Sequence, residues 1–131
     1  VVASCLAYDD ETGVDLYGES MLRNDRGQVA QVAYGFDYHY QCCLELLGTK
    51  GKFTTGRLFT APPGLATTMT VESADGARDV VLEPDNAYEN MVALFSSELQ
   101  AGSYERHWRD GLDQARLLED VRQLGNAGSK T

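Results

Sequence analysis

Two stretches carry the residue types that could do chemistry on a small polar ligand. His39 stands between Tyr38 and Tyr40, and Arg57 follows further along the chain. A histidine between tyrosines could act as a general base beside aromatic rings that stack on a sugar. The alternative is a histidine on a polar strand face between two core-facing tyrosines. The sequence favours this alternative, because a general base needs a partner within reach and no partner for His39 is apparent.

The acidic and thiol groups do not form a recognisable site. One acidic cluster lies near the N-terminus: Asp9, Asp10, Glu11 and Asp15. It lacks the ligand and glycine spacing of a calcium loop, so it indicates a solvated turn. Cys5, Cys42 and Cys43 are odd in number and lack a CxxC spacing. They predict three reduced thiols in a cytoplasmic protein and no metal site.

The motifs and the charge of the 131 residues exclude several kinds of cofactor site and partner. No GxGxxG or Walker motif is present, so no cofactor-binding residue is predicted. The net charge of −9 argues against nucleic acid as a partner. No apolar run approaches the roughly 20 residues of a membrane span. The chain begins at Val1 without an initiator methionine, which we interpret as a processed chain or a fragment.

Period-two alternation is the strongest structural signal, and it runs from Ala30 to Leu46 with an expected bend between Asp37 and Tyr40. Further strands are bounded by turn residues such as Asn24–Gly27 and Asp75-Gly76. The expected strands cover residues 2–8, 14–23, 28–37, 52–59, 67–73 and 78–82. The expected strands come before the expected helices along the chain. This order predicts an α+β fold, with a mostly antiparallel open sheet of about six strands and helices on one face.

Two helices are expected in the last third of the chain. The first is capped by Asn86 with Glu89 in a capping-box position, and Gly102 ends it. The second covers residues 110–124 and stops at Gly125. Together these elements predict one sheet-plus-helix domain over residues 1–131.

Residues 34–64, followed by the two helical segments, resemble the C-terminal domain of the glucose–fructose oxidoreductase/inositol dehydrogenase (Gfo/Idh/MocA) superfamily. The resemblance is carried by an E-x-x-G-x-x-G turn and an R-x-F-T-x-P stretch. These residues are Glu45, Gly48, Gly51, Arg57, Phe59, Thr60 and Pro62. The Phe-Thr-Ala-Pro-Pro form looks most like nucleotide-sugar ketoreductases.

The resemblance implies a parent enzyme in which a Rossmann domain binds NAD or NADP. The catalytic segment of such enzymes would precede this sheet, so no catalytic residue is carried over. The sheet implies a substrate-binding and oligomerisation domain that is not catalytic by itself. A sugar or nucleotide-sugar site is expected at the strand ends, with aromatic stacking and an arginine that grips a diphosphate. The expected substrate-binding residues are Tyr38, Tyr40, Arg57, Phe59 and Pro62.

A sheet covered by helices on one face leaves its other face for a partner. The odd-register residues Val29, Ala33, Gly35 and Cys43 are small enough for another sheet to approach. We therefore expect a homo-oligomer formed through this open face. The alternative is a free-standing dimerisation or sugar-binding module without redox activity. A small independent enzyme using His39 or the cysteines is the least favoured hypothesis.

Overall fold

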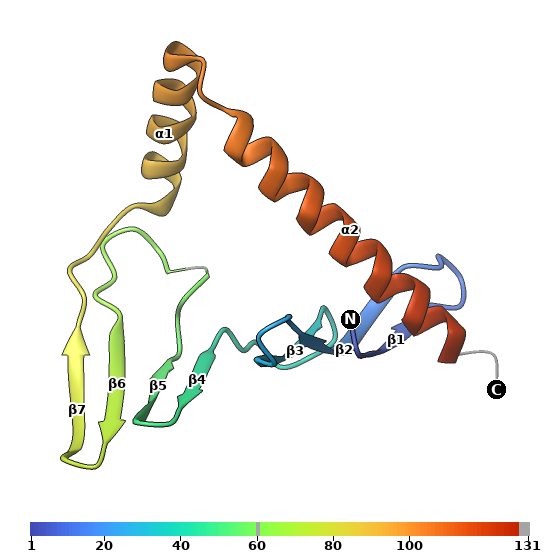
Figure 1. Cartoon of the computed structure of the whole chain (residues 1–131), viewed down its shortest axis with the longest axis horizontal. Helices are drawn as coiled ribbons and strands as arrows, with labels where there is room; N and C mark the ends of the chain where they lie inside the picture. The colour runs from blue at the N-terminus through green and yellow to red at the C-terminus, as the bar shows by residue number, and fades with distance from the viewer. Residues whose placement is uncertain (60, 129–131) are drawn as a thin grey trace. The chain divides into compact units, whose positions relative to one another are not determined.

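The computed structural model describes residues 1–59 and 61–128 (Figure 1). The chain divides into two compact units, one made of residues 1–39 and the segment from Tyr104 onward, the other of residues 40–103. Each unit combines an antiparallel sheet with one helix. The predicted α+β class is therefore confirmed. No helix of the described residues is long and apolar enough to cross a membrane.

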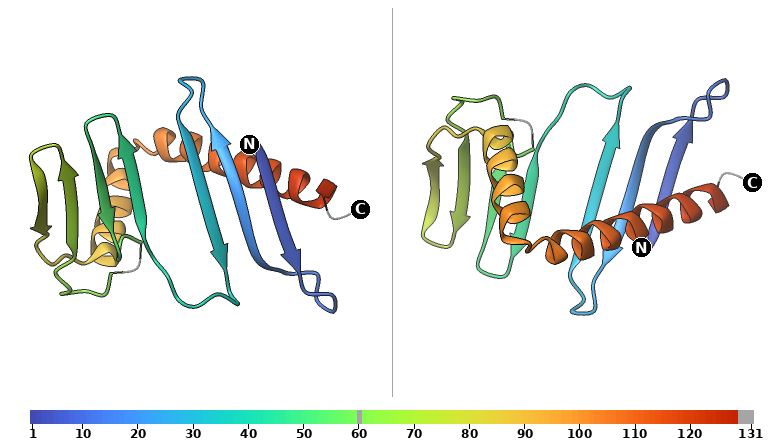
Figure 2. Two further views of the ribbon diagram at one scale, coloured as in Figure 1. Left: turned by 90° about the horizontal axis from the view of Figure 1, so that it is seen from below. Right: turned by 90° about the horizontal axis from the view of Figure 1, so that it is seen from above.

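The first unit is a three-stranded antiparallel sheet with one long helix. Its strands are β1 (Ala3–Tyr8), β2 (Asp15–Arg23) and β3 (Val29–Gly35), in the order β1-β2-β3. The predicted turn joins β2 to β3, where Asn24 Oδ1 accepts hydrogen bonds from the backbone N–H groups of Arg26 and Gln28, both at 3.0 Å. Helix α2 (Glu105–Gly128) lies across one face of this sheet (Figure 2).

The core of this unit lies where α2 meets β1. Leu6 and Val121 are 7% and 8% exposed, and Gly125 is also buried. A Cβ atom on Gly125 would lie 2.6 Å from Leu6 Cγ, so the glycine lets the helix backbone approach the strand. The sequence prediction that Gly125 stops the helix was therefore wrong. The helix also begins at Glu105, earlier than the predicted residue 110.

The opposite face of the three-stranded sheet is open. Strand pairing places Tyr17 opposite Gly35 and Glu19 opposite Ala33 on this face. The predicted register of Val29, Ala33 and Gly35 agrees with this arrangement, and all three residues are exposed. Cys43 precedes β4 in the other unit and does not lie on this sheet.

The second unit is a four-stranded antiparallel sheet followed by helix α1 (Ala87–Ala101). Its strands are β4 (Leu44–Gly48), β5 (Gly51–Thr55), β6 (Thr68–Ser73) and β7 (Gly76–Val81). The long alternation from Ala30 to Leu46 thus breaks between β3 and β4, and seven strands in two described sheets replace the expected six or so in one. Periodicity cannot locate such a break, because the residues between the strands keep the alternation.

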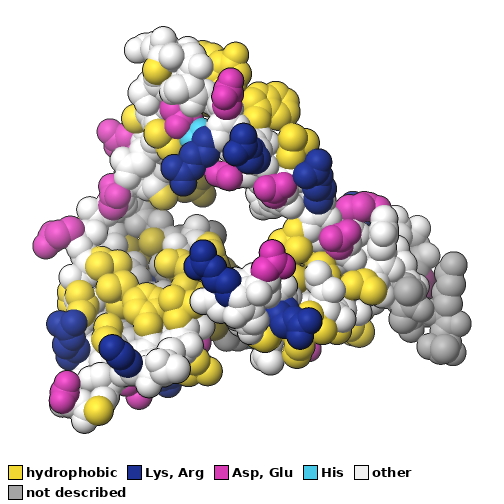
Figure 3. All heavy atoms as spheres, viewed as in Figure 1, with side chains coloured by type: hydrophobic (Ala, Val, Ile, Leu, Met, Phe, Trp, Pro, Cys, Tyr) yellow, Lys and Arg dark blue, Asp and Glu magenta, His cyan; other side chains and the backbone are white. Residues whose placement is uncertain are grey.

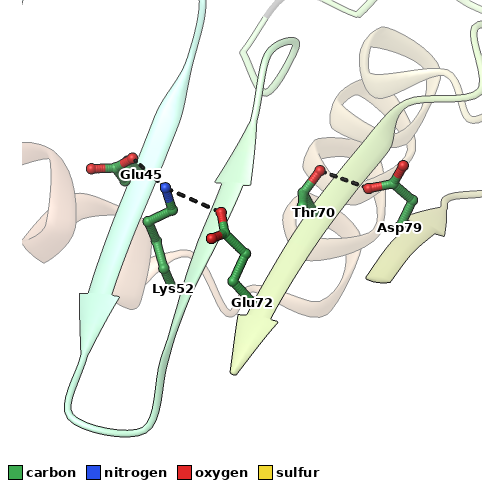
Figure 4. A network of polar contacts seen from close by, with 5 residues as sticks. All are labelled: Glu45, Lys52, Thr70, Glu72 and Asp79. Carbon is green, nitrogen blue, oxygen red and sulfur yellow. Dashed lines mark hydrogen bonds and ion pairs between the residues drawn. The ribbon is translucent and has the colours of Figure 1, made fainter. Parts of the chain in front are cut away.

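One face of the four-stranded sheet is polar. Lys52 Nζ lies 3.1 Å from a Glu72 oxygen and 3.5 Å from a Glu45 oxygen (Figure 4). The hydrogen bond that Lys52 donates to Glu72 raises the pKa of Lys52, and the negative charges of Glu72 and Glu45 raise it further. Thr70 Oγ1 donates to Asp79 at 2.8 Å beside this network. These cross-strand contacts align β4, β5, β6 and β7 in register.

Helix α1 has the caps that the sequence predicted. Asn86 Oδ1 accepts from the Glu89 N–H at 3.3 Å, and Gly102 ends the helix with φ +64°. Its apolar stripe is nevertheless exposed, and Figure 3 shows hydrophobic side chains at several places on the surface of the chain. The stripe consists of Tyr88, Met91, Val92, Phe95 and Leu99, each between 59% and 67% exposed.

Candidate ligand-binding site

The candidate site lies at the open end of the β4–β5 hairpin. Leu44 at the start of β4 pairs with Thr55 at the end of β5. The residues just before Leu44 and just after Thr55 therefore emerge at the same end of the hairpin, and they form two arms. One arm carries Tyr40 and Cys42, and the other carries Arg57 and Phe59.

Arg57 and Tyr40 join the two arms through their side chains. The guanidinium carbon of Arg57 lies 5.1 Å from the centre of the Tyr40 ring. Arg57 Nη1 also donates a hydrogen bond to Tyr40 Oη at 3.4 Å. A cation over an aromatic face is attracted by the ring quadrupole, and here the same ring supplies an acceptor. The contact orients an exposed guanidinium, a group suited to bidentate recognition of phosphate oxygens.

A hydrogen bond from a backbone N–H to a cysteine sulfur joins the second arm to the first. The N–H of Phe59 donates to Cys42 Sγ at 3.4 Å, while the Phe59 ring is 71% exposed. The following loop turns at Pro62, whose carbonyl accepts from the Leu65 N–H at 3.1 Å. Thr60, part of the resemblance, lies outside the described residues. The geometry thus presents an arginine, a tyrosine and a phenylalanine near one hairpin end.

Tyr38 belongs to the other unit. It stacks on Tyr17, with ring centres 5.2 Å apart and an angle of 26° between the planes. Burial, then the charge of Glu19, raises the pKa of Tyr38, with smaller contributions from Tyr17 and Cys5. Glu19 and Cys5 are paired residues of the open face, so the Tyr38 ring is associated with that face.

Of the five residues predicted from the sequence, the structure brings Tyr40 and Arg57 into contact. Phe59 and Pro62 follow Arg57 in the same unit, and Tyr38 belongs to the other unit. Sequence reasoning did not single out Cys42 as an acceptor for Phe59, nor Tyr17 as the partner of Tyr38. The sequence did contain a signal for Tyr17. Its odd-numbered position in the strand places its ring on the same face as Glu19 and Met21, which is the open face of the sheet.

The comparisons with known proteins agree on one kind of protein. The chain is 29% identical over 126 residues to dTDP-3,4-didehydro-2,6-dideoxy-alpha-D-glucose 3-reductase of Saccharopolyspora spinosa, covering 91% of this chain and 38% of that protein. The enzyme with the same description from Streptomyces antibioticus is 30% identical over 106 residues, covering 79% of this chain and 32% of that protein. No protein-family model matches the chain.

The solved structures extend this similarity to the fold. KijD10, a 3-ketoreductase from Actinomadura kijaniata solved in complex with NADP and TDP-benzene, superimposes with a TM-score of 0.87 at 27% identity. The match covers 94% of this chain and 38% of that protein. These relatives confirm the predicted resemblance to the Gfo/Idh/MocA superfamily of sugar oxidoreductases. Within that class the chain is similar to the nucleotide-sugar 3-ketoreductases. It spans less than half the length of these relatives.

Proposed function

We propose that this chain is the substrate-side domain of an NADP-dependent ketoreductase that acts on a nucleotide-activated sugar. The observation that carries the proposal is the similarity over nine-tenths of the chain to 3-reductases of dTDP-linked sugars. The hydride transfer itself is assigned to a nucleotide-binding domain and catalytic segment outside these 131 residues. NADP rather than NAD follows from the cofactor in the solved relatives.

Within this function, Arg57 binds the diphosphate of the nucleotide-sugar and Tyr40 holds the guanidinium in place. The planar fork of arginine can give two parallel hydrogen bonds to phosphate oxygens. Phe59 and Pro62 form a relatively rigid apolar wall beside it, since a proline loop loses little entropy when it binds. Tyr38 contributes to the sugar side only if its stack with Tyr17 opens.

The proposal includes self-association through the open face of the three-stranded sheet. An uncovered sheet face with several apolar residues is typical of an interface. Residues 1–131 as one C-terminal domain and a cytoplasmic location remain predictions. The three cysteines support the location, because reduced thiols are typical of that compartment.

The alternative is a free-standing sugar-binding or dimerisation module without redox activity. The Tyr17–Tyr38 pair favours it, because stacked exposed tyrosines can contact a sugar ring. A catalytic partner domain is not required for that role. Activity measurements on the whole protein that carries this chain separate the two functions.

The test is Arg57→Ala in that whole protein, with Arg26→Ala as the matched control in an exposed turn. Loss of a charged hydrogen bond of about 1.5–3 kcal/mol should raise KM for a nucleotide-sugar roughly tenfold or more. The control should leave KM unchanged. Arg57→Lys should recover only part of the loss, because an ammonium lacks the fork geometry. An unchanged KM in a folded Arg57→Ala variant would place the diphosphate elsewhere.

A further inference from the structure

The two arms at the open end of the β4–β5 hairpin do not continue the pairing of the strands. Straight continuation of that register would place Cys42 opposite Arg57. It would likewise place Tyr40 opposite Phe59. The observed contacts are exchanged, because Arg57 Nη1 donates to Tyr40 Oη while the Phe59 N–H donates to Cys42 Sγ, both at 3.4 Å. The chain bends at Leu58 and Phe59, and the bend brings the Phe59 backbone back beside Cys42.

Phe59 is anchored through its backbone, whereas its ring lies on the surface. The ring is 71% exposed, although Phe53 on the neighbouring strand β5 is half-buried. The segment after Phe59 is also held, since the Pro62 carbonyl accepts from the Leu65 N–H at 3.1 Å. An aromatic ring fixed in this way loses little conformational entropy when a flat ligand packs against it.

We propose that the Phe59 ring stacks on the nucleobase of the nucleotide-sugar whose diphosphate Arg57 binds. The inference rests on the function proposed above for Arg57, and it names the part of the substrate that this arm recognises. Arg57 and Phe59 are two positions apart on the same arm, and both are exposed. The nucleoside is joined directly to the diphosphate, so a diphosphate on Arg57 brings the base close to this arm. Phe59 is thereby a specificity-determining residue for nucleotide-linked sugars.

The chemistry of the substrate assigns the base, rather than the sugar, to this ring. In a nucleotide-sugar the base and the sugar are attached at opposite ends of the diphosphate. The sugar carries the reacting carbonyl, which must meet the cofactor and the catalytic segment that the proposed function assigns to residues outside this chain. The nucleoside end takes no part in the hydride transfer, so this domain can bind it. A base offers a flat π face, on which an aromatic side chain stacks without needing a charged partner.

The first experiment separates the base from the diphosphate. Calorimetry on the whole protein that carries this chain, saturated with NADP, compares TDP with inorganic pyrophosphate, which lacks a base. Phe59→Leu should weaken TDP binding roughly tenfold, the loss expected when a base loses an aromatic partner, and should leave pyrophosphate binding unchanged. Arg57→Ala should weaken the binding of both ligands. The matched control Phe36→Leu replaces an exposed phenylalanine of the other unit and should change neither.

A second measurement does not depend on lost affinity. Phe59→Trp keeps an aromatic face, so it should bind TDP about as tightly as the unmodified protein. TDP should quench the fluorescence that this variant adds, whereas pyrophosphate should not. Unchanged TDP affinity in Phe59→Leu, equal weakening of both ligands or an unquenched tryptophan would each overturn the stacking, and Arg57→Ala would still report the diphosphate site. Failure of the unmodified protein to bind TDP would overturn the proposed function as well.

Discussion

Tyr38 and Tyr40 are separated by one residue in the sequence, and they have different surroundings in the structure. Tyr40 supplies a ring face and a hydroxyl to Arg57, whereas Tyr38 stacks on Tyr17 beside Glu19. Alternation alone predicts the same face for both. The chain leaves the strand pattern between Gly35 and Leu44, so that prediction does not hold beyond β3. The ligand-binding role of Arg57 is therefore best tested together with its Tyr40 contact.

The raised pKa of Tyr38 predicts a change in stability at alkaline pH. Burial and the negative charge of Glu19 make the folded state hold the phenol proton more tightly than the unfolded chain. The stability linked to this proton is complete below the ordinary tyrosine pKa of about 10 and is lost as the pH rises through the raised value. Tyr38→Phe should therefore lose less stability above about pH 10 than the unmodified chain. Urea midpoints measured against pH check this, with the neutral midpoint as reference. Identical alkaline losses would contradict the assignment.

At the scale of the elements, glycines decide how α2 packs. Gly111 and Gly125 lie in the same helix, and nothing lies within 4 Å of a Cβ placed on Gly111. A Cβ on Gly125 would meet Leu6, which is buried and has little room to move. A side chain therefore fits at position 111 but not at position 125, although a glycine at either position weakens an isolated helix.

We predict that Gly125→Ala destabilises the chain by about 1–3 kcal/mol, the range for overpacking a core. Gly111→Ala, the matched control, should stabilise it by roughly 0.5–1 kcal/mol, because alanine favours a helix interior. Urea unfolding followed by circular dichroism measures both changes. A Leu6→Ala change should relieve part of the Gly125→Ala defect. Equal effects of the two glycine variants would show that α2 does not depend on close approach to β1.

At the scale of the whole molecule, the two units divide the proposed tasks. The first unit carries the open sheet face proposed for self-association, and the second carries the Arg57–Tyr40 contact. The exposed stripe on α1 adds a further apolar surface to the second unit. Neither sheet is parallel or doubly wound, as a dinucleotide-binding unit would be.

The chain by itself is predicted to bind neither NAD nor NADP. Its sequence has no glycine-rich turn between a strand and a helix, and its described strands pair antiparallel. Isothermal titration with millimolar cofactor should give no saturable heat. The same titration on the protein that joins this chain to a nucleotide-binding domain should saturate. Saturable binding to the 131 residues would contradict the proposal that the cofactor binds to a domain outside them.

Local chemistry was sufficient for much of the fold. Four features depend on residues that are close in sequence: the Asn86 cap, the Gly102 end of α1, the Asn24–Gly27 turn and the Asp75-Gly76 hairpin. Their hydrogen bonds and backbone preferences act over a few residues, so composition and spacing predict them. The antiparallel α+β class and the register of β3 follow from the same local alternation.

The tertiary structure decided what depends on residues far apart in the chain. Gly125 lies inside a helix that packs closely against Leu6, and Tyr38 stacks on Tyr17. The contact of Arg57 with Tyr40 likewise depends on the pairing of β4 with β5. The residues next to each of these positions in the sequence do not show whether such a contact forms. Only packing between distant segments selects among the alternatives, because burial and close approach are properties of the folded chain.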